Sequence, residues 1–171
     1  MPLETVVNDV CSLRILTPTD AKRIFEIVQA DKQISERYVT WLAGVESEAD
    51  VAQRIEQFNA NRALRYAIVS DGELAGYIGA WQHNFDSTSK EYDFGYLCDP
   101  AYRGRGLVVS SAEHMMRLLA AHMNAQSFAL YINDGNEASR AVAKKLAFTR
   151  TEEVITDEIL GVDERRWEKS A

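Results

Sequence analysis

The sequence predicts an α+β domain in which one mixed sheet of six or seven strands is flanked by about four helices. Short apolar runs, several of them alternating with polar residues, are typical of strands, whereas longer segments repeat their apolar residues every three to four positions, as amphipathic helices do. These segments follow one another in the order β-α-α-β-β-β-α-β-α-β-β. The chain has 171 residues, and this length predicts a single domain spanning residues 1–171.

The first part of the chain contains one strand and two helices. The run Leu13–Leu16 is a short strand, and the Thr-Pro-Thr-Asp sequence at 17–20 is a typical helix start. The segment Ser35–Leu42 carries two aromatic residues but has no clear period. Ser47, followed by acidic residues, is expected to cap a second helix that ends near Asn61.

A hairpin and a third strand follow. The apolar runs Tyr66–Val69 and Leu74–Trp81 are separated by the turn sequence Ser-Asp-Gly-Glu at 70–73, so we expect them to pair antiparallel. The polar stretch Gln82–Lys90 is expected to be a loop, and Glu91–Cys98 the next strand.

The last part alternates helices and strands. Pro100 closes the preceding strand, and Leu107–Met123 places its apolar residues on one helical stripe. Phe128, Leu130 and Ile132 alternate as a buried strand, an Asn-Asp-Gly-Asn turn follows at 133–136, and Glu137–Leu146 has a helical period. Two further strands are expected to complete the sheet, Arg150–Ile159 and Glu164–Lys169.

Composition limits the classes of function. The net charge is −7 and the basic residues are scattered, which argues against a direct nucleic-acid substrate and suits a cationic acceptor such as an amine. No apolar run is long enough for a membrane span, and the first nine residues lack the character of a signal peptide, so we expect a cytoplasmic location without membrane contact.

Cysteine and histidine usage predicts neither disulfides nor a metal site. The two cysteines, Cys11 and Cys98, are expected to be free thiols. His114 and His122 share a helix face but are eight positions apart, too far for a metal-binding pair on adjacent turns, and His83 lies on a loop.

The turn Arg103-Gly104-Arg105-Gly106-Leu107-Val108 is the most informative stretch, because it lies between a strand and a long amphipathic helix. The first N–H groups of a helix have no intrahelical partner, and the helix dipole adds partial positive charge, so an anion is stabilised there. Glycines allow close approach of the backbone, and the two arginines can add charge-assisted hydrogen bonds. The turn therefore predicts a phosphate site, although an exposed glycine loop would give the same short pattern.

This turn resembles the acetyl-CoA motif of the GCN5-related N-acetyltransferases, which reads Arg or Gln, any, any, Gly, any, Gly or Ala. Arg103 and Gly106 match the motif, whereas Val108 departs from it. The resemblance runs from Leu13 to Trp167 and implies the fold of that family, with a central, twisted, mainly antiparallel mixed sheet, and acetyl-CoA as the acetyl donor. It further implies that the donor lies where the strands ending at Cys98 and Ile132 part, with backbone groups of Leu97 and Cys98 polarising the thioester.

A second stretch resembles the family's other signature. Asn136 matches a residue that supports the pantetheine arm, and Phe148 matches, while Ala147 stands where the family has Gly. The family's usual proton-donating Tyr is Ala143 here. In the Rim-type branch, which acetylates N-termini of ribosomal proteins, a Ser on the first helical turn takes that role, and Ser139 matches it; a plain cap at the helix start is the alternative.

Acetyl transfer also needs a base, because an ammonium has no lone pair. Glu158, nineteen residues after Ser139, matches a Glu of the Rim-type pattern and is the first candidate, with Asp93 in reserve and a relayed water as the remaining alternative. Four aromatic residues are candidates for the wall of an acceptor pocket, although aromatic residues also fill cores: Tyr38, Trp41, Trp81 and Tyr96.

The resemblance thus favours an N-acetyltransferase that acts by direct attack of a primary amine, first of all a protein or peptide N-terminal α-amine. An acetyltransferase of a small amine, such as a polyamine, an antibiotic or an aminoacyl conjugate, is the alternative. A non-catalytic acyl-CoA-binding module is a third interpretation, and the resemblance leaves a homodimer open.

Overall fold

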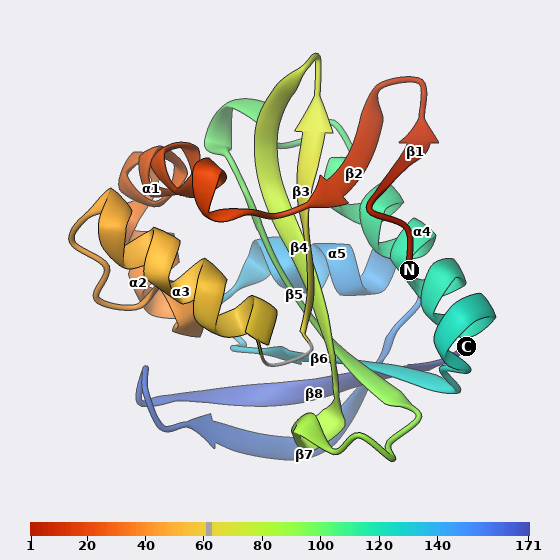
Figure 1. Ribbon diagram of the computed structural model, residues 1–171. Helices are drawn as coiled ribbons and strands as arrows, with labels where there is room; N and C mark the ends of the chain where they lie inside the picture. Colours follow the sequence, from red (N-terminus) through yellow and green to blue (C-terminus); the bar gives the residue numbers. More distant parts are fainter. Residues whose placement is uncertain (61–62) are drawn as a thin grey trace.

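The computed structural model describes residues 1–60 and 63–171. Within them the chain forms eight strands and five α-helices (Figure 1). The strands are β1 (Glu4–Asn8), β2 (Cys11–Ile15), β3 (Leu64–Ser70), β4 (Glu73–Gln82), β5 (Glu91–Cys98), β6 (Ser127–Ile132), β7 (Thr149–Asp157) and β8 (Val162–Ser170). The α-helices are α1 (Ala21–Ala30), α2 (Lys32–Tyr38), α3 (Glu48–Ala60), α4 (Leu107–Met123) and α5 (Glu137–Lys145). Short 3-10 helices are η1 (Pro18–Asp20), η2 (Thr40–Leu42), η3 (His83–Phe85) and η4 (Pro100–Tyr102).

All eight strands belong to one mixed sheet with the order β1-β2-β3-β4-β5-β6-β8-β7. Neighbouring strands are antiparallel except β5 and β6, which are parallel. The parallel pair is short, because its register covers only Glu91↔Ser127, Tyr92↔Phe128 and Asp93↔Ala129. Beyond Asp93 the two strands part, and this opening at the centre of the sheet positions the site described below.

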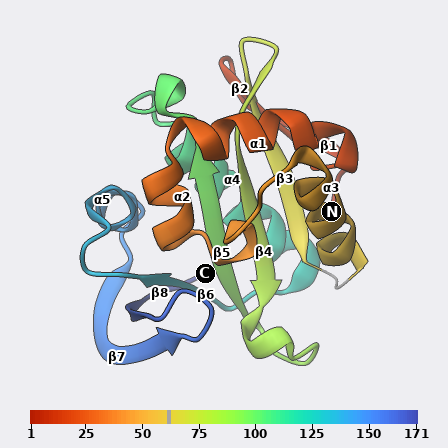
Figure 2. The ribbon, with the colours of Figure 1, turned by 90° about the vertical axis from the view of Figure 1, so that its left-hand side faces the viewer.

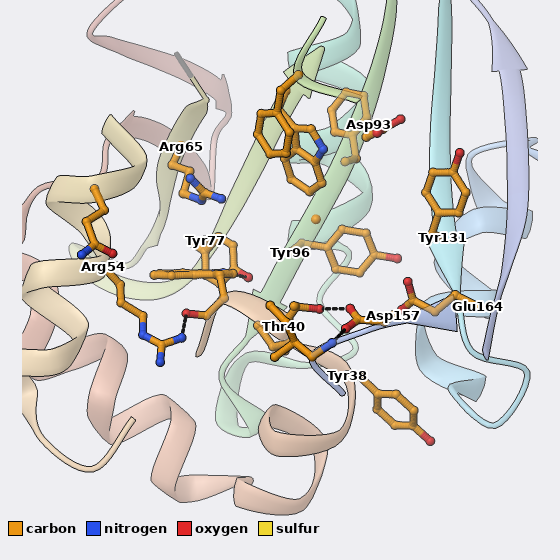
Figure 3. A pocket seen from close by; sticks show the side chains of 18 of the residues that line it. Tyr38, Thr40, Arg54, Arg65, Tyr77, Asp93, Tyr96, Tyr131, Asp157 and Glu164 are labelled. Carbon is orange, nitrogen blue, oxygen red and sulfur yellow. Dashed lines mark hydrogen bonds between the residues drawn. The ribbon is translucent and has the colours of Figure 1, made fainter. Parts of the chain in front are cut away.

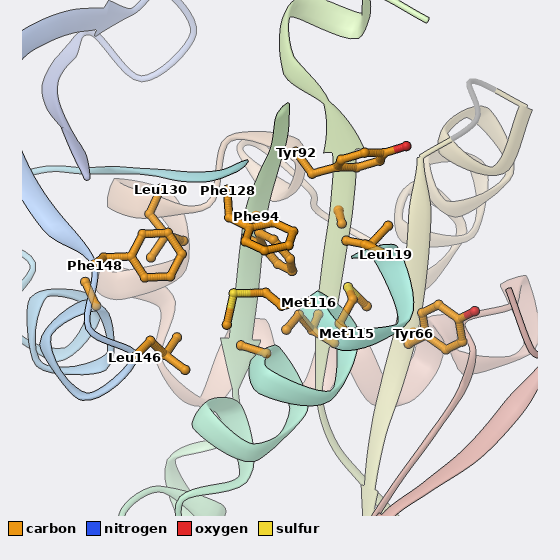
Figure 4. Close-up of a cluster of buried hydrophobic side chains, with 14 of the residues drawn as sticks. Tyr66, Tyr92, Phe94, Met115, Met116, Leu119, Phe128, Leu130, Leu146 and Phe148 are labelled. Atoms are coloured by element: carbon orange, nitrogen blue, oxygen red, sulfur yellow. The ribbon is translucent and has the colours of Figure 1, made fainter. Parts of the chain in front are cut away.

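Helices cover both faces of the sheet. Figures 1 and 2 show α1, α2 and α3 on one face and α4 and α5 on the other. On the α4 face, Met115 and Leu119 are fully buried, and Phe94 and Phe128 meet edge to face with ring centroids 5.6 Å apart (Figure 4). Burying each such side chain stabilises the fold by about 1.5–3 kcal/mol. The α4 face therefore carries a large share of the core.

The other face has its own buried cluster, which joins α1 and α3 to the sheet. Ile24 and Ile27 of α1 and Ile55 of α3 have no exposed surface, and they pack in one cluster with Tyr77 of β4. Ile24 and Ile27 are three positions apart and lie on the same side of α1, as expected for an amphipathic helix packed on a sheet.

An ion pair fixes the entry into α1. Arg14 of β2 donates two hydrogen bonds, of 2.8 and 2.7 Å, to the carboxylate of buried Asp20. The same carboxylate accepts the backbone N–H of Thr17 at 2.9 Å. Burial alone would raise the pKa of Asp20, but the hydrogen bonds from Arg14 and Thr17 outweigh it and lower the pKa. The Thr-Pro-Thr-Asp stretch therefore starts the helix as predicted.

Glycine at position 76 is required by close approach of β4 and β5. A Cβ atom there would lie 2.2 Å from the carbonyl oxygen of Leu97. Any side chain would displace the C-terminal end of β5.

The structure confirms the α+β class but corrects the number of elements. It contains eight strands, not six or seven, because β1 pairs with β2 at the edge of the sheet. Strand β1 alternates between exposed and half-buried residues, with Val6 72% exposed, so it has no buried run that could have predicted it. The segment Ser35–Leu42 overlaps α2 and η2. Asn61, the predicted end of the second helix, lies outside the described residues.

Among the described residues, no helix combines the length and apolar character needed to cross a bilayer.

Candidate functional site

The parting of β5 and β6 opens into a cavity of about 280 Å³ between the end of β5, the start of α4 and the start of α5. Most residues predicted from the sequence to bind the cofactor line this one cavity. They are Leu97, Cys98, Arg103, Gly104, Gly106, Leu107, Val108, Asn136 and Ser139. Of the predicted set only Arg105 is not among the lining residues, whereas Lys145, which the sequence did not single out, is.

The turn before α4 has the backbone that a phosphate group requires. Gly104 and Gly106 have φ angles of +79° and +78°, and a Cβ atom at either position would meet nothing within 4 Å. Gly106 is the N-cap of α4, and no side chain caps the helix there. The first N–H groups of this 17-residue helix therefore have no side-chain cap, and the first residues of the helix line the cavity.

A buried carboxylate holds the start of this turn in place. Asp99 accepts the backbone N–H of Ala101 at 2.8 Å and forms an ion pair with Arg23 of α1. The same Arg23 donates to the carbonyl oxygen of Leu74 at 3.2 Å. These contacts tie the turn before α4 to α1 and β4.

Both arginines of the turn are already paired with carboxylates. Arg103 lies 2.7 Å from Asp31, and Arg105 lies 2.9 Å from Asp71, with its guanidinium over the ring of Tyr102. Their direct contact with phosphate stays a prediction, since an anion would have to compete with these partners.

Cys98 lines the cavity but has a weakly reactive thiol. Burial raises the pKa of Cys98 to about 11, although Arg103 lowers it somewhat. Because only the thiolate is an effective nucleophile, the environment of Cys98 does not favour a reaction in which this cysteine is acetylated as an intermediate.

The first turn of α5 presents Ser139 to the same cavity. Asn136 is the N-cap of α5, and its side chain accepts the backbone N–H of Ser139 at 3.1 Å. The hydroxyl of Tyr96 on β5 donates to the backbone carbonyl of Ser139 at 3.5 Å. Burial raises the pKa of Tyr96 to about 12, so its hydroxyl stays protonated. At the end of the helix Ala147 has a φ of +59°, which explains why glycine is the expected residue there.

A second, larger cavity of about 1230 Å³ adjoins the first. Tyr38, Val39 and Tyr96 line both cavities, so the two spaces meet at these three residues. The four predicted aromatic wall residues, Tyr38, Trp41, Trp81 and Tyr96, all line the larger cavity.

One side of the larger cavity is cationic and aromatic. Arg65 is only 4% exposed, and its guanidinium lies 5.2 Å from the ring centroid of Trp41 and 5.9 Å from that of Trp81. Burial lowers the pKa of Arg65 to about 10, so it keeps its charge at neutral pH. The rings of Trp81 and Phe85 lie within 14° of parallel, with centroids 6.4 Å apart.

The opposite side is acidic, as Figure 3 shows. Asp157 at the end of β7 and Glu164 on β8 line the cavity, and neither was singled out by the sequence. Asp157 accepts hydrogen bonds from Thr40 Oγ1 and from the backbone N–H groups of Ile159 and Leu160, the last two at 2.9 and 2.8 Å. Burial, together with the charge of Asp157, raises the pKa of Glu164 to about 7.

Comparison with known proteins identifies the family. The model of the acetyltransferase (GNAT) domain matches residues 11–149, which is most of the chain. The chain belongs to the GNAT acetyltransferases.

Individual relatives are distant. YdaF of Bacillus subtilis (strain 168), whose name gives it a provisional assignment as a ribosomal N-acetyltransferase, is 26% identical over 150 residues, covering 83% of this chain and 79% of YdaF. A structure of the microcin C7 self-immunity acetyltransferase MccE with acetyl-CoA and AMP matches with a TM-score of 0.85 and 22% identity, covering 100% of this chain and 98% of that one. A structure of RimL, the ribosomal L7/L12 α-N-protein acetyltransferase, with coenzyme A matches with a TM-score of 0.83 and 20% identity, covering 98% of this chain and 97% of that one. At these identities the structural matches establish the fold.

In this GNAT domain the two predicted bases occupy very different places. Glu158 is exposed in the turn between β7 and β8 and is not among the residues that line either cavity, whereas its neighbour Asp157 is. The structure therefore does not bring Glu158 together with the other predicted residues, because it lies in the exposed part of the turn.

Asp93 is only 6% exposed and lines the larger cavity of the GNAT domain. Its carboxylate lies 3.1 and 3.2 Å from Nδ1 of His83, and burial raises the pKa of Asp93 while His83 lowers it. His83, Glu91 and Asp93 have ligand atoms within 4.8 Å of one another, but Glu91 is already neutralised by Arg166 at 2.6 Å. This arrangement is explained as an ion-pair network.

Proposed function

We propose that this GNAT acetyltransferase transfers the acetyl group of acetyl-CoA to the N-terminal α-amine of a protein or peptide. The observation that carries the proposal is the meeting of two cavities at Tyr38, Val39 and Tyr96. One cavity has an open helix N-terminus suited to a diphosphate, and the other has an acidic side suited to an amine. A transferase needs two such spaces in contact at the point where the group moves.

The residues of the smaller cavity fit acetyl-CoA. The N–H groups at the start of α4 would hold its diphosphate, and the backbone of Leu97 and Cys98, where β5 has left β6, would pair with the pantetheine arm. When bound, acetyl-CoA supplies an acetyl group activated as a thioester. The chain itself contributes positioning and proton transfer.

Ser139 is proposed to give a proton to the departing sulfur. It lines the cofactor cavity at the first turn of α5, held by Asn136 and contacted through its backbone by Tyr96. The buried Ala143 carries no hydroxyl for this task. The hydroxyls of Ser139 and Tyr96 are both protonated at neutral pH. The Ser139 side chain is not needed to cap α5, because Asn136 is the capping residue.

An α-amine is favoured as the acceptor on two grounds. The ordinary pKa of an α-amine is about 8, against about 10.4 for lysine, so an α-amine is far easier to deprotonate near neutral pH and a single carboxylate can accept its proton. The larger cavity, at about 1230 Å³, exceeds the roughly 300–1,000 Å³ typical of small-molecule sites and can admit the first residues of a chain. The similarity to YdaF and RimL, named as ribosomal-protein N-acetyltransferases, points in the same direction.

A second candidate is an aminoacyl conjugate that carries a flat ring. The near-parallel rings of Trp81 and Phe85, beside the charge of Arg65, form a surface on which such a ring can stack. The structure of MccE, which resembles this chain in fold, contains AMP together with acetyl-CoA.

The test compares acceptors at fixed acetyl-CoA. The purified chain is incubated separately with four kinds of acceptor, and thiol release is measured. They are peptides with a free N-terminus, the same peptides with a blocked N-terminus and an internal lysine, spermidine, and an aminoacyl nucleotide analogue. Turnover with the free peptides alone supports the proposal, and turnover with the nucleotide analogue alone supports the second candidate. Tight binding of CoA by calorimetry without thiol release for any amine would indicate a binding module.

A further inference from the structure

We propose that Glu164 is the residue that takes the proton from the acceptor amine, with Asp157 beside it as a fixed anion. The inference rests on the proposed acetyl transfer and names the base for it. Its basis is the pairing of β7 and β8 at the acidic side of the larger cavity (Figure 3).

The register of the two strands brings the carboxylates together. Ile155 lies opposite Glu164, and Asp157 lies opposite Val162. Because side chains alternate between faces, Asp157 and Glu164 are diagonal neighbours on one face, a spacing that long side chains can bridge. Both line the larger cavity.

The two carboxylates have opposite surroundings. Asp157 accepts three hydrogen bonds, from Thr40 Oγ1 and from the N–H groups of Ile159 and Leu160. These three donors hold the Asp157 carboxylate in place. Glu164 is half-buried and close to that charge, so the pKa of Glu164 rises to about 7. Glu164 therefore combines a raised pKa with access to the cavity, whereas Asp157 is held by its three donors.

Each element packed around Glu164 contributes a group that bears on its titration. Asp157 of β7 raises its pKa, while Tyr131 of β6 and Tyr96 of β5 line the same cavity and are neutral at pH 7, since burial raises the pKa of both phenols. Arg166, two positions further along β8 on the same face, is engaged with Glu91 and Glu153.

The other two candidate bases are less well placed. Asp93 already has His83 as its hydrogen-bond partner, and Glu158 is exposed outside both cavities. Glu164 combines cavity access with partial burial, and Tyr96, which lines the same cavity, also lines the cofactor cavity.

The reaction balances with this assignment. The ammonium form of the acceptor gives one proton to the Glu164 carboxylate, directly or through one water. The nitrogen lone pair then forms the N–C bond to the acetyl carbon, and the C–S bond breaks with its electron pair going to sulfur. The second amine proton is lost to solvent as the amide forms, and the thiolate takes one proton from Ser139, which is restored from solvent.

The test is the pH dependence of kcat/KM with the peptide acceptor. The wild-type chain should show an ascending limb near pH 7, because Glu164 must be ionised to act. Glu164→Gln should lose that limb and leave only the limb of the α-amine at about 8, with a drop on the order of 10²-fold at pH 7. Glu152→Gln, an exposed carboxylate on the same hairpin, is the matched control and should behave as wild type.

Three outcomes of the kinetic assays would overturn the assignment. An unchanged pH profile in Glu164→Gln, with folding verified by circular dichroism, would overturn it while leaving the acetyltransferase proposal intact. Loss of the limb near pH 7 in Glu158→Gln, with the limb retained in Glu164→Gln, would assign the role of proton acceptor to Glu158 in the turn. Absence of thiol release by the wild-type chain with every amine would overturn both proposals. Carbon-13 NMR of the side-chain carboxyls gives a readout without turnover: a resonance titrating near pH 7 and missing only in Glu164→Gln supports the assignment, and its absence contradicts it.

Discussion

Replacing Gly106 with alanine separates the backbone strain of the phosphate turn from its role in binding. Gly106 has a φ of +78° and no atom within 4 Å of an added Cβ, so alanine meets no steric clash with the protein. The left-handed conformation alone should cost about 1–2 kcal/mol for a residue with a Cβ. For a chain of this size each kcal/mol lowers Tm by roughly 2–4 °C, so differential scanning calorimetry should show a loss of about 2–8 °C.

Gly161 provides the matched control. It lies in the turn between β7 and β8 with a φ of +65°, it also has no atom within 4 Å, and it lines neither cavity. Gly161→Ala should therefore lower Tm by a similar amount. Titration calorimetry should show weaker CoA binding for Gly106→Ala, because its methyl group occupies the space in front of the α4 N-terminus, and unchanged binding for Gly161→Ala. Equal CoA affinity in both variants would refute the placement of the diphosphate at this turn.

Three further predictions concern single contacts. Ser139→Ala should lower kcat about 10–100-fold with CoA affinity within a factor of two, as measured by thiol release and calorimetry. Arg103→Ala combined with Arg105→Ala should raise the Kd of CoA about fivefold, since each exposed ionic contact contributes about 0.5 kcal/mol; an unchanged Kd would remove both side chains from the site. Asp20→Asn should destabilise the fold by about 2 kcal/mol in urea unfolding at pH 7, a value reduced for the partial exposure of Arg14. Because the pKa of Asp20 is lowered in the fold, this difference is present above pH 4 and should shrink as the pH falls below it; a constant difference would contradict the ion pair.

The sequence predicted the segments whose pattern is local. The turn Ser-Asp-Gly-Glu at 70–73 joins β3 and β4 in the expected hairpin, and the apolar stripe of 107–123 matches α4. Strand β1 could not be predicted in this way, because its stability comes from pairing with β2 and from contacts such as the Tyr66 hydroxyl, which donates to the carbonyl of Pro2 at 2.6 Å.

In the candidate site, too, the residues that belong to local motifs could be predicted, and the residues that only strand pairing brings together could not. Residues carried by motifs, such as Gly106 and Ser139, fell into one cavity as expected. Asp157 and Glu164 belong to no motif, and only the register of β7 against β8 makes them neighbours. The resemblance to the Rim-type pattern selected Glu158, one position beyond Asp157, which lines the cavity. Strand β7 ends at Asp157, so Glu158 already belongs to the exposed turn.

The brief contact between β5 and β6 has a mechanical consequence. In the described part of the sheet, three residue pairs of the ladder join the five strands on one side to the three on the other, so few backbone hydrogen bonds hold the two parts together there. Backbone groups of β5 beyond Asp93 that face β6 lack a ladder partner, and hydrogen–deuterium exchange should be fast there in the empty protein. A molecule bound in the opening would supply hydrogen-bond partners to these backbone groups and would make the connection between the two parts of the sheet more rigid.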